Sequence, residues 1–301
     1  MGKSKIEWTE MTWSPVTGCT HVSDGCDNCY AERMAKRLAG RAGYPKHKPF
    51  AVTMHKDRLR QPFHWRKSRV IFVCSMSDLF HPQVPTEFRY EVFDTMLKAD
   101  WHTYLLLTKR PARMRDDMRG ALCGSEALGR EHIWVGTSVE DQRTANDRIP
   151  YLLDINAPRR FISCEPLLGP IHIEPYLRTM RQAEDGSMEP AIQWVIVGGE
   201  TGPGARPMHP YWVQSLKDQT LDEGACFFFK QWGEWRARPA FEKREAPYVV
   251  MNMMGQQVKA GEKGAAMFER VGRKRAGREL DGKLWEQRPS LLGVPAERAA
   301  T

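Results

Sequence analysis

The chain has 301 residues, of which 41% are hydrophobic and 27% charged. These fractions are ordinary for a folded globular protein and disfavour disorder of the chain as a whole. The 45 Lys and Arg residues exceed the 37 Asp and Glu residues by eight, and this excess permits a polyanionic partner such as nucleic acid without requiring one. No apolar run approaches the ~20 residues that cross a bilayer, so we expect a soluble, cytoplasmic protein with no membrane partner.

Short apolar runs recur about every 30 residues, the length of one strand–helix unit. A first strand is predicted at 11–14. Continuously apolar runs, typical of strands covered on both faces, predict further strands at 69–74, 103–107, 132–136, 160–164, 194–198 and 226–230. Helical periodicity predicts helices at 31–38, 87–98, 111–119 and 209–219, and the last three begin at or near a proline.

This series of strand–helix units favours an α/β protein with a partial or complete parallel β/α barrel over a doubly wound sheet. We assign residues 1–235 to the barrel and residues 236–301 to a basic C-terminal extension with one weak strand at 248–250. The basic run 272–278 in this extension is suited either to phosphate contacts or to a solvated surface. No GxGxxG or GxxxxGK[ST] loop occurs, which disfavours a dinucleotide-binding or P-loop protein.

Polar residues follow the last six of the seven predicted strands, at 75–78, 108–110, 137–140, 163–166, 198–201 and 230–232. Because the carboxyl ends of barrel strands meet on one face, and active sites lie on that face, these residues predict an active-site mouth. The residues expected to line it are Lys109, Thr137, Glu165, Glu200 and Lys230.

Three of the seven cysteines, Cys19, Cys26 and Cys29, fall within one short segment with the spacing C-x6-C-x2-C. Three thiolates can hold three corners of a metal centre, and soft sulfur selects zinc, copper(I) or iron–sulfur. A structural zinc site needs four ligands, so His21 or a distant cysteine would have to supply the fourth. An iron–sulfur cluster bound by three cysteines leaves one iron for a non-protein ligand.

The segment 15–32 resembles the Pro-x-x-Gly-Cys…Cys-x-x-Cys-Tyr-Ala entry of radical S-adenosylmethionine (radical SAM) enzymes, particularly those of the spore photoproduct lyase type. Over roughly residues 5–285, the segments 74–81, 107–111, 135–140, 163–170, 198–207 and 229–235 resemble the three-cysteine-motif phage proteins. That family includes phage gene products 37 and 68 and has no assigned reaction.

The resemblance implies a [4Fe-4S] cluster on Cys19, Cys26 and Cys29, with S-adenosylmethionine on the unique iron and an external electron donor. Gly198-Gly199-Glu200 resembles the element that contacts the methionine amino group in that superfamily, although here it follows about the sixth strand rather than the second. The residues after the second predicted strand are therefore alternatives for this role. These residues are Ser75 and Asp78, and Tyr30 is the aromatic residue next to the last cysteine. The cofactor-binding candidates are therefore Tyr30, Ser75, Asp78, Gly198, Gly199 and Glu200.

We therefore expect a radical SAM enzyme of lyase or transferase type that acts on nucleic acid or a nucleotide. The substrate-binding candidates are Lys109, Arg110, Thr137, Arg206 and Lys230, and the catalytic candidates are Cys164 and Glu165. Two alternatives stay open. One is a non-catalytic nucleic-acid-binding protein with a structural zinc, and the other is an iron–sulfur redox sensor that does not use S-adenosylmethionine.

Overall fold

The computed structural model describes residues 4, 6–119, 129–183, 186–238 and 248–289. The chain divides into two compact units: the first contains residues 1–23, 29–138 and 148–161, and the second contains residues 24–28, 139–147 and 162–301. Cys123, one of the seven cysteines, lies outside the described residues. No helix in the described part of the chain is long and apolar enough to cross a membrane.

Seven strands form one parallel sheet in the order in which they occur along the chain. They are β1 (Met11–Trp13), β4 (Val70–Val73), β5 (Thr103–Thr108), β6 (Ile133–Ser138), β7 (Arg159–Cys164), β10 (Trp194–Gly198) and β11 (Cys226–Gln231). A sheet wound in one direction without a reversal of strand order is characteristic of β/α barrels, whereas a doubly wound sheet reverses. Among the described residues β1 and β11 are not paired, so the predicted β/α barrel is confirmed in its partial form.

The predicted strands and helices are confirmed to within a few residues. The helices are α1 (Tyr30–Arg37), α2 (Thr86–Lys98), α3 (Pro111–Arg119) and α7 (Pro210–Asp222). A further helix, α5 (Gln142–Leu153), was not predicted; it carries Pro150 in its interior, which obscures the sequence signal. The short elements up to residue 177 are β2 (Val16–Thr17), η1 (Asp24–Cys26), β3 (Thr53–Met54), η2 (Lys56–Arg58), η3 (Gln61–His64) and α6 (Glu174–Leu177).

The first unit has its core on strands β1, β4, β5 and β6. Ile71 of β4 lies beside Met11 of β1 on one side and Tyr104 of β5 on the other. Trp13 and Tyr104 are fully buried, with ring centroids 6.0 Å apart. These strands are apolar on both faces because both faces are covered, and each buried Ile, Leu or Phe side chain contributes about 1.5–3 kcal/mol.

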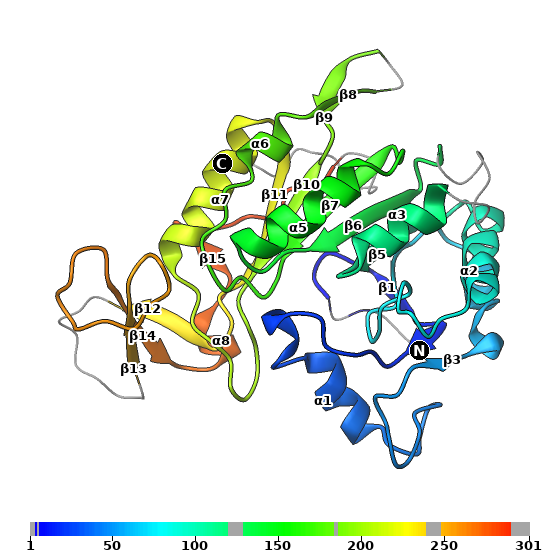
Figure 1. Ribbon diagram of the computed structural model, residues 1–301, viewed down its shortest axis with the longest axis horizontal. Helices are drawn as coiled ribbons and strands as arrows, with labels where there is room; N and C mark the ends of the chain where they lie inside the picture. The colour runs from blue at the N-terminus through cyan, green and yellow to red at the C-terminus, as the bar shows by residue number, and fades with distance from the viewer. Residues whose placement is uncertain (1–3, 5, 120–128, 184–185, 239–247, 290–301) are drawn as a thin grey trace. The chain divides into compact units, whose positions relative to one another are not determined.

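The second unit contains β10 and β11, which pair in parallel with Val195 beside Phe227. The register shifts after Val197, so Gly198 pairs with Gln231. After β11, strands β12 (Trp235–Arg238), β14 (Ala266–Arg270) and β13 (Tyr248–Met251) form a separate antiparallel sheet, followed by α8 (Arg273–Ala276), β15 (Glu279–Leu280) and β16 (Lys283–Leu284). The hairpin of β8 (Met180–Gln182) and β9 (Met188–Pro190) extends away from the other strands of the unit (Figure 1). The domain boundary after residue 235 stays a prediction.

The outer edge of β11 is paired with a later segment of the same unit. The Phe229 N–H donates to the Trp285 carbonyl at 2.9 Å, and the Gln287 N–H donates to the Phe227 carbonyl at 3.2 Å. The Phe227 N–H donates to the side-chain oxygen of Gln287 at 2.9 Å, and Phe228 forms a bridge with Glu286. The last strand of the sheet therefore has few free backbone groups along this edge.

Candidate functional site

The cysteine loop, residues 18–29, connects β2 to α1 and follows the first strand of the sheet. It begins at Gly18, whose φ of +81° lies in the left-handed region that favours glycine. A Cβ at this position would lie 2.2 Å from the carbonyl oxygen of Ala51, so the close backbone approach also requires glycine. The Cys19 N–H then donates to the Phe50 carbonyl at 3.2 Å, which fixes the start of the loop.

Cys19, Cys26 and Cys29 are free thiols and are partly exposed, whereas Cys74 and Cys164 are buried. Burial is the largest cause of a raised pKa for the Cys19 thiol, and the nearby Asp78 carboxylate raises it further, while Arg110 opposes both. Accessible thiols are suited to a soft metal centre, whereas a buried cysteine is usually inert. The chemistry of this donor set therefore fits a soft metal centre, either an iron–sulfur cluster or zinc.

In the described residues, no three His, Cys, Asp or Glu side chains are gathered closely enough to hold a metal ion. His21, the candidate fourth ligand for zinc, is exposed, and its Nε2 lies 3.3 Å from Glu32 Oε2. Glu32 also pairs with Lys36 at 2.8 Å, and these two contacts lower its pKa.

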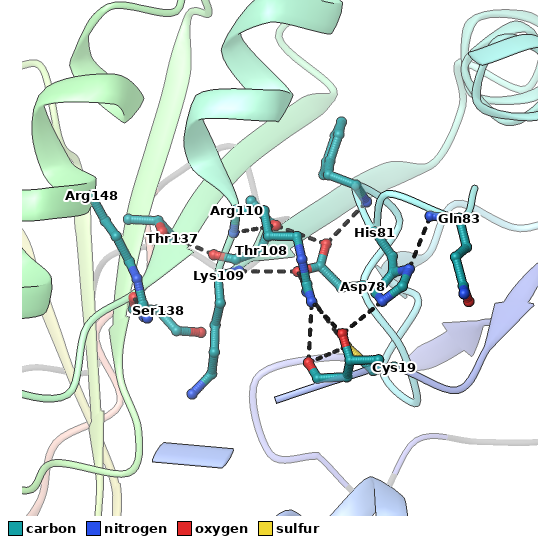
Figure 2. Close-up of polar contacts among 12 residues, drawn as sticks. Cys19, Asp78, His81, Gln83, Thr108, Lys109, Arg110, Thr137, Ser138 and Arg148 are labelled. Atoms are coloured by element: carbon teal, nitrogen blue, oxygen red, sulfur yellow. Dashed lines mark hydrogen bonds and ion pairs between the residues drawn. The ribbon is translucent and has the colours of Figure 1, made fainter. Parts of the chain in front are cut away.

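A polar cluster in the first unit joins the ends of β4 and β5 to the cysteine loop (Figure 2). Asp78, which follows β4, accepts from the Thr108 hydroxyl at 2.7 Å and from the Phe80 N–H at 3.0 Å. Arg110, which follows β5, donates from Nη1 to Asp78 Oδ2 at 2.9 Å and to Cys19 Sγ at 3.5 Å. Figure 2 shows these side chains converging, whereas the Lys109 side chain points away from them.

The neighbouring candidates in the first unit are engaged with the backbone. Tyr30 is 45% exposed, and its hydroxyl donates to the Ser75 carbonyl at 2.7 Å. The Thr137 hydroxyl is fully buried and donates to the Thr108 carbonyl at 2.9 Å. Tyr30 and Ser75 therefore lie together beside the last cysteine, whereas Thr137 offers no exposed surface.

A second polar cluster, in the second unit, holds residues 24–28 of the cysteine loop. Glu200, which follows β10, is buried and accepts from Arg206 Nε at 2.9 Å, from Arg206 Nη2 at 2.6 Å and from Asn28 Nδ2 at 3.0 Å. Arg206 Nη2 also donates to the Asp24 carbonyl at 2.7 Å. The hydrogen bond to Glu200 is the largest cause of a raised pKa for Arg206. An arginine–carboxylate pair thus binds this stretch of the loop.

A third cluster, also in the second unit, pairs Glu165 with Lys230 at the carboxyl ends of β7 and β11. Lys230 Nζ donates to both carboxylate oxygens of Glu165, at 2.8 and 3.0 Å. The Glu165 side chain is 21% exposed and the Lys230 side chain is 16% exposed, so the pair is partly accessible. A Cβ on Gly198 would lie 3.1 Å from the Glu165 carboxyl carbon, so the glycine makes room for this carboxylate. Cys164, next in the chain, is fully buried, and burial raises its thiol pKa.

Three contributors were not assigned from the sequence: Thr20, His81 and Asn28. The Thr20 hydroxyl lies 2.8 Å from His81 Nε2 and accepts from Arg110 Nη2 at 3.1 Å. Asn28 donates to Glu200 and, at 3.0 Å, to the Gly204 carbonyl. Their only signal in the sequence was their place in the cysteine loop or after a strand end.

The fold and these clusters define an α/β protein with a parallel sheet and a three-cysteine loop after its first strand. The chain belongs to the family described as Protein of unknown function (DUF5131), which matches residues 3–289. No curated protein matches the chain.

Among solved structures, the chain is similar to a cysteine-to-serine mutant of spore photoproduct lyase, with a TM-score of 0.47 and 12% identity over 91% of this chain and 72% of that chain. It is also similar to spore photoproduct lyase complexed with dinucleoside spore photoproduct, with a TM-score of 0.47 and 10% identity over 90% and 71% of the two chains. A mutant of spore photoproduct lyase with bound AdoMet and dinucleoside spore photoproduct gives a TM-score of 0.45 and 12% identity over 90% of this chain and 71% of that chain.

Proposed function

We propose that this protein is a radical SAM-type iron–sulfur enzyme of phage or bacterial origin that acts on nucleic acid or a nucleotide. The observation that carries the proposal is the set of three partly exposed thiols, none of them in a disulfide, on the loop after the first strand of a parallel β/α sheet. Cys19, Cys26 and Cys29 would hold a [4Fe-4S] cluster through three irons and leave the fourth for S-adenosylmethionine.

When bound, the cluster and S-adenosylmethionine supply the electron transfer and radical chemistry, and the chain supplies binding, orientation and exclusion of water. The cofactor-binding candidates stay Tyr30, Ser75, Asp78, Gly198, Gly199 and Glu200. Asp78 and Glu200 each already accept from an arginine. An ammonium group binding at either carboxylate would therefore share it with that arginine.

For the substrate, we propose that Lys109, Lys230 and Arg206 attract phosphate groups. The net charge of +8 supports this, since cations that neutralise phosphates make binding strong at low salt. Glu165, which holds Lys230 through both oxygens, is the group best placed to orient that cation or to exchange a proton with a bound substrate. Cys164 stays a weaker catalytic candidate because it is fully buried.

Purification and reconstitution without oxygen, with iron, sulfide and zinc assayed on one sample, test the metal centre. We expect about four irons and four sulfides per chain. Replacing Cys19, Cys26 or Cys29 with Ala should abolish the cluster, whereas Cys226→Ala, which removes another partly exposed thiol, should retain it. One tightly bound zinc in a colourless protein would instead support a structural-zinc protein.

Reduction with dithionite in the presence of S-adenosylmethionine separates an enzyme from a redox sensor. We expect slow release of 5′-deoxyadenosine from the loaded protein even without substrate. A protein that holds the cluster and releases none would support the sensor alternative.

Fluorescence anisotropy with labelled single- and double-stranded DNA and RNA across a salt series tests the substrate class. Absence of binding to every nucleic acid at low salt would contradict it.

A further inference from the structure

We propose that Arg110 is a positioning residue, which together with Asp78 holds the Cys19 end of the cysteine loop and donates to the Cys19 sulfur. This inference rests on the proposed function, because it concerns how a cluster ligand is held. It assigns Arg110 to the cysteine loop rather than to the substrate.

Most N–H groups of the Arg110 guanidinium donate to other residues of this chain. Besides Asp78 and Cys19, its Nη2 donates to the carbonyl and to the hydroxyl of Thr20, both at 3.1 Å. The side chain is only 11% exposed. One guanidinium therefore bonds two consecutive residues of the loop on one side and a carboxylate on the other, and little of its donor capacity is left for a substrate.

Asp78 fixes the orientation of this guanidinium. Its side chain is 7% exposed, and it accepts from the Thr108 hydroxyl and from the Lys109 N–H at 3.3 Å in addition to Arg110. The Arg110 N–H donates to the Thr108 hydroxyl oxygen at 2.9 Å. The ends of β4 and β5 thus provide a rigid base, from which Arg110 reaches the loop.

The geometry requires arginine rather than any cation. A guanidinium presents five N–H donors in a planar fork, whereas an ammonium is a compact charge that cannot reach a sulfur, a carbonyl and a carboxylate together. Hydrogen bonds to cysteine sulfurs are among the factors that set the potential of an iron–sulfur cluster. Donation from Arg110 to Cys19 should therefore favour the reduced cluster and keep the ligand in place.

The test compares Arg110→Ala and Arg110→Lys with Arg115→Ala in the full chain. Arg115 is a matched control because it lies on α3 and its guanidinium pairs with Asp116 and Asp154, which are not part of the cysteine loop. Circular dichroism and melting temperature establish that each variant is folded. The readouts are cluster potential by EPR-monitored redox titration, loss of iron to a chelator, and hydrogen exchange of a peptide covering residues 19–21 in the cluster-free protein.

We expect Arg110→Ala to lower the reduction potential of the cluster by about 59 mV. For one electron, this shift corresponds to a roughly tenfold lower ratio of reduced to oxidised cluster. Iron loss and hydrogen exchange at 19–21 should each accelerate at least about fivefold, with Arg110→Lys intermediate and Arg115→Ala unchanged. Wild-type potential and wild-type exchange in folded Arg110→Ala would overturn the inference. A wild-type chain that binds no iron would overturn the proposed function instead, and the exchange measurement would still decide whether Arg110 holds the loop.

Discussion

Replacing Arg206 with methionine should destabilise the second unit, because it leaves the buried Glu200 carboxylate without its cationic partner. Glu200 is only 4% exposed and receives Arg206 through both the Nε and Nη2 groups. Methionine preserves much of the side-chain volume but removes the positive charge and all of its donors. Among the described residues, the carboxylate would keep the Asn28 amide and the backbone N–H of residue 206 as its partners.

The size of the loss follows from the burial of the two partners. Removing one member of a fully buried ion pair costs about 3–5 kcal/mol. Arg206 is 34% exposed, so water can reach the vacated space and screen the carboxylate, and we expect about 2 kcal/mol. Combining Arg206→Met with Glu200→Gln removes the unpaired charge, so the double variant should lose about 1 kcal/mol less than the sum of the single variants.

Urea unfolding followed by tryptophan fluorescence measures these free energies. With a slope of about 2 kcal/mol per molar urea, the midpoint of the Arg206→Met protein should fall by about 1 M. A loss below about 0.5 kcal/mol, or strictly additive losses in the double variant, would refute the argument that the Glu200 carboxylate depends on this arginine.

Gly18→Ala should cost about 2 kcal/mol or more, because it combines a positive φ with a backbone clash, whereas Gly224→Ala, at φ +75° with nothing within 4 Å, should cost only about 1 kcal/mol; equal losses in urea unfolding would contradict this. Burial holds the pKa of His102 below its ordinary 6.5, and desolvation lowers the pKa of His132 and His209 in the same way. The unfolded chain therefore binds more protons, and the urea midpoint should fall as pH drops from 7.5 to 5.5, whereas a flat profile would oppose it. Lys109→Met should reduce the slope of log affinity for nucleic acid against log salt by about one unit, while Lys98→Met, at an exposed helical pair, should leave it unchanged. Equal slopes for both variants would remove Lys109 from the substrate site.

The strands were predictable because each is a continuous apolar run, and their similar spacing indicated the winding of the sheet. The hairpin β8–β9 gave no such signal, since Met180 and Met188 are exposed and the strands are three residues each. Sequence spacing likewise placed Asp78 and Arg110 at strand ends but could not pair them. Their contact depends on the register of β4 with β5, and the contact to Cys19 spans 91 positions of the chain.

The segment that pairs with the outer edge of β11 covers backbone groups that another chain could otherwise bond. Strand β11 reads Cys-Phe-Phe-Phe-Lys-Gln, and a six-residue run of this kind, with high β-propensity and little charge, can recruit other chains when its backbone is free. Residues 285–287 occupy that backbone from nearly sixty positions downstream. During synthesis, β11 therefore emerges well before residues 285–287. Cleavage of the chain near residue 280 would remove these residues and leave the edge of β11 free to pair with other chains.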